Sequence, residues 1–193
     1  HTAQALRLLI LTATRPGETR GARWAEFDLE AALWTIPASK TKMRKEHVVP
    51  LSRQAIGILK GVQSLTAQGG YVFPSIRTHR RPMSDNTINA GLRRLGYATD
   101  EMTAHGFRAM LSTLLNESGK WNPDAIERAL AHGDTDIVGP AGVVNAPCDH
   151  DHRALGDVLA DAFADDIEAG DPMPFGFGLA IAVAVLEVVG GGE

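Results

Sequence analysis

Residues 102–119 read MTAHGFRAMLSTLLNESG, and this stretch decides how the chain is interpreted. Its apolar side chains recur at helical spacing: Phe107, Leu111, Leu114 and Leu115. That spacing predicts a helix with one face buried in a core. His105 and Arg108 stand three positions apart near the predicted start. Residues i and i+3 share a helix face, so the two side chains can approach one point.

The start of such a helix suits an anion. A helix N-terminus favours negative charge, and an imidazole and a guanidinium there would add hydrogen-bond donors. The pattern is therefore compatible with a phosphate site. The alternative is a histidine that caps the helix and an arginine on the surface, and this stretch taken alone favours that alternative.

The composition is that of a globular protein. The chain has 193 residues, of which 44% are hydrophobic and 22% charged. Its one cysteine, Cys148, excludes a disulfide framework and a cysteine-based zinc site. The longest unbroken apolar run, 179–186, is too short to cross a bilayer, and no signal peptide is visible. We expect a cytoplasmic fragment without membrane contact, whose natural N-terminal part precedes His1.

Charge divides the chain into two parts. Residues 1–137 hold 18 Lys and Arg against 13 Asp and Glu, a net of +5. Residues 138–193 hold 1 Arg against 10 Asp and Glu, a net of −9. A mildly basic body can bind nucleic acid, and an acidic tail would compete with it.

The pattern of apolar and turn residues predicts several helices in residues 1–137. The first helix should stop near Thr14, because the residue before Pro16 avoids the helical region. The other predicted helices are 17–24, one capped by Ser52, one from Ser84 as N-cap to Gly96 as C-cap, and one from Asn122 to Gly133.

Short strands are predicted at 33–37 and 46–51, with a brief extended stretch at 71–75. The first two flank a polar loop and should form a β-hairpin with a basic tip. Residues 1–137 are therefore expected to be α+β, mainly α-helical with a small antiparallel β-sheet. Residues 138–193 begin with a loop rich in Gly and Pro and form a divergent acidic and apolar tail of uncertain fold.

Three further residues could complete a phosphate site. Arg15 lies at a turn between helices, Lys42 at the tip of the basic hairpin, and His132 at the end of a helix. Each alone is a weak signal, because residues of these types in such places are commonly solvated or interact with the helix dipole.

Together and in this order, these residues resemble the tyrosine recombinase (site-specific integrase) family, most closely its prophage-integrase branch. The resemblance runs from residue 1 to about Val138. It is carried by "TRPGE", "W…F-D-L…W-T-I-P", "KTKMRKEHVVPLS", "YVFPS", "MTAHGFRAMLSTLLNE" and "IERALAHGD". It implies a catalytic domain that cuts one DNA strand with a tyrosine hydroxyl and rejoins it, without metal, nucleotide cofactor or small-molecule substrate. The implied partner is double-stranded DNA carrying an attachment site, on which the family self-associates.

The resemblance also implies roles, and the chemistry of each side chain suits its role. Arg15 and Arg108 would bind the non-bridging phosphate oxygens and stabilise the charge that grows in the transition state. Lys42 would protonate the leaving 5′-oxygen. His105 would assist proton transfer and His132 would hydrogen-bond the phosphate. Glu18 is expected to orient the first turn rather than to act in catalysis.

The nucleophile is missing from its expected place near Gly142. The chain has two tyrosines, Tyr71 and Tyr97, and both precede His105. We expect Tyr97 to be a packing aromatic, and Ser112 and Cys148 are weaker candidates still. A slipped reading frame, a decayed prophage gene or a genuine fused segment would each explain the tail. The first predicts that another frame near codon 138 restores a helix with a tyrosine.

Two other interpretations stay open. The chain could be a catalytically inactive DNA-binding remnant, or an unrelated helical interaction domain in which the five site residues are scattered. The stretch "CDHDH" at 148–152 could suggest a metal site, but its spacing fits no standard zinc pattern. We expect neither a metal nor a cofactor.

Overall fold

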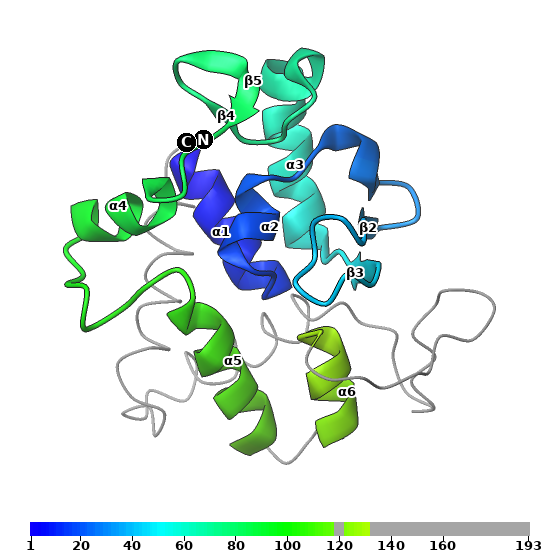
Figure 1. The fold of residues 1–193 in the computed structure, drawn as a ribbon, viewed down its shortest axis with the longest axis vertical. Coiled ribbons are helices and arrows are strands. Elements are labelled where there is room, and N and C mark those ends of the chain that lie inside the picture. Colours follow the sequence, from blue (N-terminus) through cyan, green and yellow to red (C-terminus); the bar gives the residue numbers. More distant parts are fainter. Residues whose placement is uncertain (118–121, 132–193) are drawn as a thin grey trace.

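A computed structural model describes residues 1–117 and 122–131 (Figure 1). Its α-helices are α1 (Thr2–Thr12), α2 (Pro16–Arg20), α3 (Arg53–Thr66), α4 (Thr87–Arg94), α5 (Gly106–Glu117) and α6 (Pro123–Ala129). Its strands are β1 (Phe27–Asp28), β2 (Leu33–Ile36), β3 (His47–Pro50), β4 (Pro74–Ser75) and β5 (Thr78–Pro82). Two short 3₁₀ helices are η1 (Trp24–Glu26) and η2 (Ala67–Gly69).

The strands form two small antiparallel sheets. One has the order β1-β2-β3, with Trp34 opposite Val49 and Ile36 opposite His47, and the other pairs β4 with β5. The predicted hairpin is confirmed, and so is the predicted fold class, mainly α-helical with a small antiparallel sheet. Strand β5 was not predicted, because "THRRP" has no apolar alternation.

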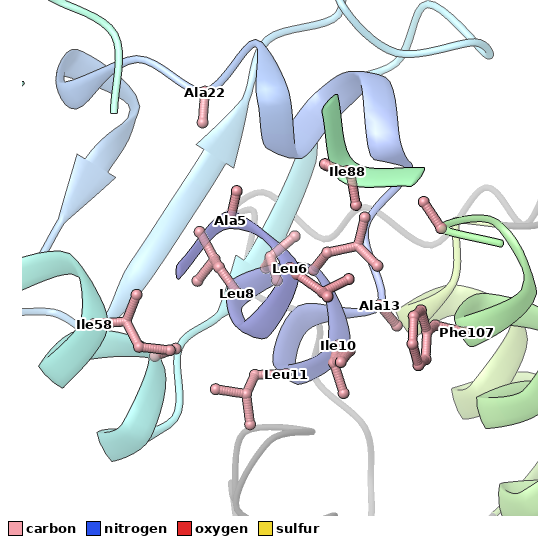
Figure 2. Packing of buried hydrophobic residues seen from close by; sticks show 14 of the residues in the cluster. Ala5, Leu6, Leu8, Ile10, Leu11, Ala13, Ala22, Ile58, Ile88 and Phe107 are labelled. Atoms are coloured by element: carbon pink, nitrogen blue, oxygen red, sulfur yellow. The ribbon is translucent and has the colours of Figure 1, made fainter. Parts of the chain in front are cut away.

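Helix α1 lies at the centre of the core and packs against α2, α3 and α4 (Figure 1). Its residues from Leu8 to Thr12 are all buried. Leu6, Leu9, Ile10 and Ala13 recur at helical spacing in the sequence. The helix is enclosed on several sides, as Figure 2 shows for Leu8, Ile10 and Leu11. A helix that is apolar nearly all round belongs in a core.

The turn after α1 is held by a chain of threonine hydroxyl groups. Ala13 adopts the left-handed conformation with φ 49° and ends the helix. The Thr12 hydroxyl donates to the carbonyl of Leu8 at 2.7 Å and lies 3.0 Å from the Thr14 hydroxyl. The Thr14 hydroxyl in turn lies 2.7 Å from that of Thr19 in α2. These buried contacts join α1 to α2 and set the direction in which the chain enters Arg15.

Two helix boundaries differ from the prediction. The predicted helix 17–24 ends at Arg20, because Arg23 is extended and forms an isolated antiparallel bridge with Tyr71. The bridge is made by the bonds from Val72 N to Ala22 O and from Trp24 N to Gly70 O, and Trp24 then begins η1. Long-range pairing there overrides local helical preference.

Ser84 does not cap α4, which begins at Thr87 after Asn86. Residues 84–87 form a turn, in which the Thr87 N–H donates to the Ser84 carbonyl. Gly96 follows the C-cap Leu95 with φ +97°, a conformation that suits glycine at a helix end. The cap of α3 is confirmed, since the Ser52 hydroxyl accepts from the Ala55 N–H at 3.1 Å.

Candidate active site

The first arginine of the site is fixed at the start of α2. The backbone N–H of Arg15 donates to Oε2 of Glu18 at 2.8 Å, and Nη1 donates to Oε1 of the same carboxylate at 3.1 Å. Glu18 is buried, so its two oxygens act as a rigid acceptor for both the backbone and the side chain of Arg15. Nη2 donates to the carbonyl of Ala131 at 3.1 Å and so ties α2 to the residues after α6. This geometry matches the orienting role expected for Glu18.

The second arginine comes from α5 and reaches the turn before Arg15. Arg108 is buried, and its Nη1 donates to the carbonyl of Ala13 at 2.6 Å. Ala13 precedes Arg15 by two residues, so this bond places Arg108 beside the turn that carries Arg15. The positive charge of Arg15 also acts on the Arg108 guanidinium. Burial and then the charge of Arg15 lower the pKa of Arg108 to about 10. The alternative that placed Arg108 on the surface is therefore wrong.

One terminal nitrogen of the Arg108 guanidinium makes no hydrogen bond within the described residues. Its Nη2 is buried and has no hydrogen-bond partner among residues 1–117 and 122–131. Leaving a buried donor of a charged group unpaired costs free energy, so such atoms are uncommon and call for a reason. A bound anion is one partner that would satisfy it.

His105 stands outside the helix that was predicted to carry it. Helix α5 begins at Gly106, whose N–H donates to the Thr103 hydroxyl at 3.1 Å. His105 is exposed, whereas Arg108 is buried. His105 and Arg108 therefore do not share a helix face as predicted, because His105 precedes the first helical residue. The carbonyl of His105 still accepts from the Arg108 N–H at 3.2 Å, so the two residues adjoin along the chain.

The hairpin tip presents two lysines in different surroundings. Lys42 is exposed, and no described residue pairs with its ammonium. Lys40 is partly buried, and its Nζ donates to the carbonyl of Gly21 at 2.6 Å and forms an ion pair with Glu26. Sequence reasoning selected Lys42 and passed over Lys40. Only the contacts show that Lys40 lies against the residues that follow α2.

His47 is a second residue of this region that sequence reasoning missed. Its Nε2 is buried without a hydrogen-bond partner in the described part of the chain. Burial lowers the pKa of His47; the charge of Glu18 acts in the opposite direction, and those of Arg108 and Arg15 lower it further. Strand alternation held a weak signal, because His47 lies on the same face of β3 as the buried Val49.

Some of the remaining candidate site residues lie beyond the part of the chain that the structure describes. His132, Gly142, the stretch 148–152 and the predicted tail 138–193 lie outside the described residues. Tyr97 packs against the hydrophobic core, which confirms its expected packing role. The Tyr71 hydroxyl accepts from Nη2 of Arg23 at 2.8 Å, and the guanidinium of Arg23 lies over its ring at 4.5 Å.

No group of three or more His, Cys, Asp or Glu side chains in residues 1–117 and 122–131 could hold a metal ion. None of the helices in the same ranges is both long enough and apolar enough to cross a membrane.

Comparison with known proteins agrees with this arrangement. The model of the phage integrase family matches residues 1–140, which include both arginines and the hairpin. The chain belongs to the phage integrase family. The integrase of Enterobacteria phage P4 is 41% identical over 150 residues, covering 71% of this chain and 34% of the phage protein. The integrase of Shigella phage Sf6 is 39% identical over 129 residues, covering 66% of this chain and 33% of its own length.

A third relative extends the similarity along the integrase chain. The prophage integrase IntZ of Escherichia coli (strain K12) is 44% identical over 171 residues, covering 88% of this chain and 41% of its own. An alignment of that length must continue past residue 140, where the family match ends. The chain thus spans roughly a third to two fifths of the length of these curated relatives.

Proposed function

We propose that this chain is the catalytic segment of a site-specific recombinase that binds double-stranded DNA at an attachment site, cleaves one strand and rejoins it through a phosphotyrosyl intermediate. The observation that carries the proposal is the bond from Arg108 Nη1 to the carbonyl of Ala13. It joins α5 to the turn that holds Arg15 and so supports one anion site with two guanidinium groups. Membership of the phage integrase family supports the same function.

The two arginines suit phosphoryl transfer without a metal ion. A guanidinium remains protonated and offers several N–H groups in a plane, so it can bind two phosphate oxygens together. Arg15 is preorganised by Glu18 and Arg108 by Ala13, and donors fixed in advance stabilise transition-state charge without the cost of reorganisation. Arg15 and Arg108 would thus hold the non-bridging oxygens of the scissile phosphate.

Proton transfer is assigned to the residues that surround this pair. Lys42, exposed at the hairpin tip, would protonate the leaving 5′-oxygen. His105, exposed at the start of α5, would assist deprotonation of the nucleophile, and His132 would hydrogen-bond the phosphate. Lys40 is the alternative acid, but it would first have to leave Glu26 and the carbonyl of Gly21.

A second function, DNA binding without cleavage, has an observation in its favour. The chain has two tyrosines; Tyr97 packs on the core and Tyr71 is engaged by Arg23. Neither suits a nucleophile that must approach the phosphate. A chain without such a nucleophile would bind the DNA backbone in a salt-dependent manner and form no covalent intermediate.

A nicked suicide substrate carrying a candidate attachment site separates the two functions. The product is read on a denaturing gel as protein that migrates with the DNA. A covalent adduct that disappears in Arg15→Ala and Arg108→Ala supports the recombinase. Salt-dependent binding of the same duplex without an adduct supports the binding function, and no binding at all contradicts both.

A further inference from the structure

His47 is held by the sheet, at the point where the hairpin tip joins β3. It is the first residue of β3 and stands opposite Ile36, the last residue of β2. The tip residues 38–46 leave the sheet at this pair. On β3, His47 shares a face with Val49, which is buried in the core. The backbone of His47 is therefore held by strand pairing, and its side chain starts on the face of the sheet that packs against the core.

The imidazole lies within the electrostatic reach of the arginine site. Glu18, Arg108 and Arg15 each act on the ionisation of His47. Burial and the two arginines together lower the pKa of His47. The ring is therefore neutral at pH 7, and it adds no third positive charge beside the two guanidinium groups.

Two buried nitrogen atoms of this region have no hydrogen-bond partner in the described part of the chain: Nε2 of His47 and Nη2 of Arg108. The carboxylate of Glu18 accepts from the side chain and backbone of Arg15 and from neither of these two nitrogens. Within the described residues the two nitrogens do not bond to each other either. Both would be satisfied by one acceptor with several oxygens, and a phosphate has that form.

We propose that His47 is a further phosphate-binding residue, whose Nε2–H donates to a non-bridging oxygen of the same DNA phosphate that Nη2 of Arg108 binds. This inference rests on the proposed function, since it requires that DNA occupies the arginine site. It assigns the Nε2-protonated tautomer to the neutral ring. It also gives the hairpin a second link to the phosphate, separate from the lysines at its tip.

The test uses the whole chain and a DNA duplex with a candidate attachment site. His47→Leu removes the donor, His47→Gln keeps an amide N–H at a similar reach, and His79→Gln on the exposed strand β5 is the matched control. We expect His47→Leu to weaken binding about tenfold, the loss typical of a hydrogen bond to a charged group. His47→Gln should recover most of that loss, and His79→Gln should bind like the parent chain.

The salt dependence distinguishes this role from that of a cation. A neutral donor releases no counterion, so the slope of log K against log salt should be the same for His47→Leu and the parent. Arg108→Gln should lower the slope by about one, because it removes a charge from a phosphate. An altered slope for His47→Leu would overturn the assignment of a neutral donor.

Long-range ¹H–¹⁵N spectra report the chemical shifts of the histidine ring nitrogens. A purely structural role of His47 would not make its Nε2 signal respond to DNA. The Nε2 signal of His47, identified by its absence in His47→Gln, should shift when the duplex is added. The inference is overturned if that signal stays in place, or if His47→Leu keeps its melting temperature and binds as tightly as the parent. If His47→Leu does not fold, the spectra of the parent chain still decide. If the parent chain binds no DNA, the proposed function fails and this inference fails with it.

Discussion

Nη1 of Arg108 lies 2.6 Å from the carbonyl oxygen of Ala13, the residue whose left-handed backbone ends the central helix α1. One hydrogen bond thus joins the helix that carries the second arginine to the turn that carries the first. The carbonyl is available because Ala13 leaves the helical path and its oxygen points away from the helix ladder. The anion site and the end of the core helix are consequently one structural unit.

Removal of the Arg108 side chain should therefore affect stability as well as DNA binding. Arg108→Ala deletes a buried, charge-assisted hydrogen bond and leaves the Ala13 carbonyl without its partner. We expect the free energy of unfolding to fall by about 1.5–3 kcal/mol. Urea denaturation followed by circular dichroism measures it. Arg94→Ala, at an exposed position at the end of α4, is the control and should change stability little. Equal stability of the two variants would show that the Ala13 contact does not support the fold.

Glu18 should act on DNA binding chiefly through Arg15, with which its carboxylate forms two hydrogen bonds. Glu18→Gln keeps the shape of the side chain and weakens its bonds to the backbone and guanidinium of Arg15. Because Arg15 keeps its charge, the number of phosphates neutralised should stay the same. We expect severalfold weaker binding to a DNA duplex with an unchanged salt slope. Fluorescence anisotropy across a salt series checks this. A slope that falls by about one would mean that Arg15 no longer reaches the phosphate at all.

The two hairpin lysines should differ in their effects, Lys40 on the stability of the fold and Lys42 on DNA binding. Lys40→Ala removes the bonds to Gly21 and Glu26, so we expect a lower melting temperature. Lys42→Ala removes an exposed charge, so we expect an unchanged melting temperature and a salt slope lower by about one. Differential scanning calorimetry and the binding series test both. A loss of covalent adduct in Lys40→Ala but not in Lys42→Ala would transfer the role of general acid to Lys40.

His47 should make stability depend on pH. Its pKa is lowered in the folded chain, so the unfolded chain binds a proton more readily. The stabilisation that results is fully present above the unfolded histidine pKa of about 6.5 and is lost as the pH falls below it towards the folded value. The parent chain should therefore lose stability between about pH 7 and pH 5 more steeply than His47→Gln. Urea titrations at several pH values measure the difference, and parallel curves would contradict it.

Local sequence signals predicted the elements that neighbouring residues stabilise. The hydroxyl of Ser52 caps α3, α1 ends shortly before Pro16, and the strands around Trp34 and Val49 form the β2–β3 hairpin. Each depends on interactions within a few residues or across one tight turn, so the pattern in the sequence is sufficient. The same signals failed at residues 22–24, where pairing with residues 70–72 competes with the local preference for a helix.

The sequence by itself therefore determined the residue types of the candidate site and the elements that carry most of them. Tertiary structure alone decided which of these residues meet. Arg108 is buried against Ala13, which is 95 positions earlier in the chain, and His105 is left exposed before the helix. It also brought His47 under the influence of Arg15, Glu18 and Arg108. The physical reason is that burial and charge–charge contact depend on how the core packs, and hydrophobic packing is too non-directional to be read from local spacing.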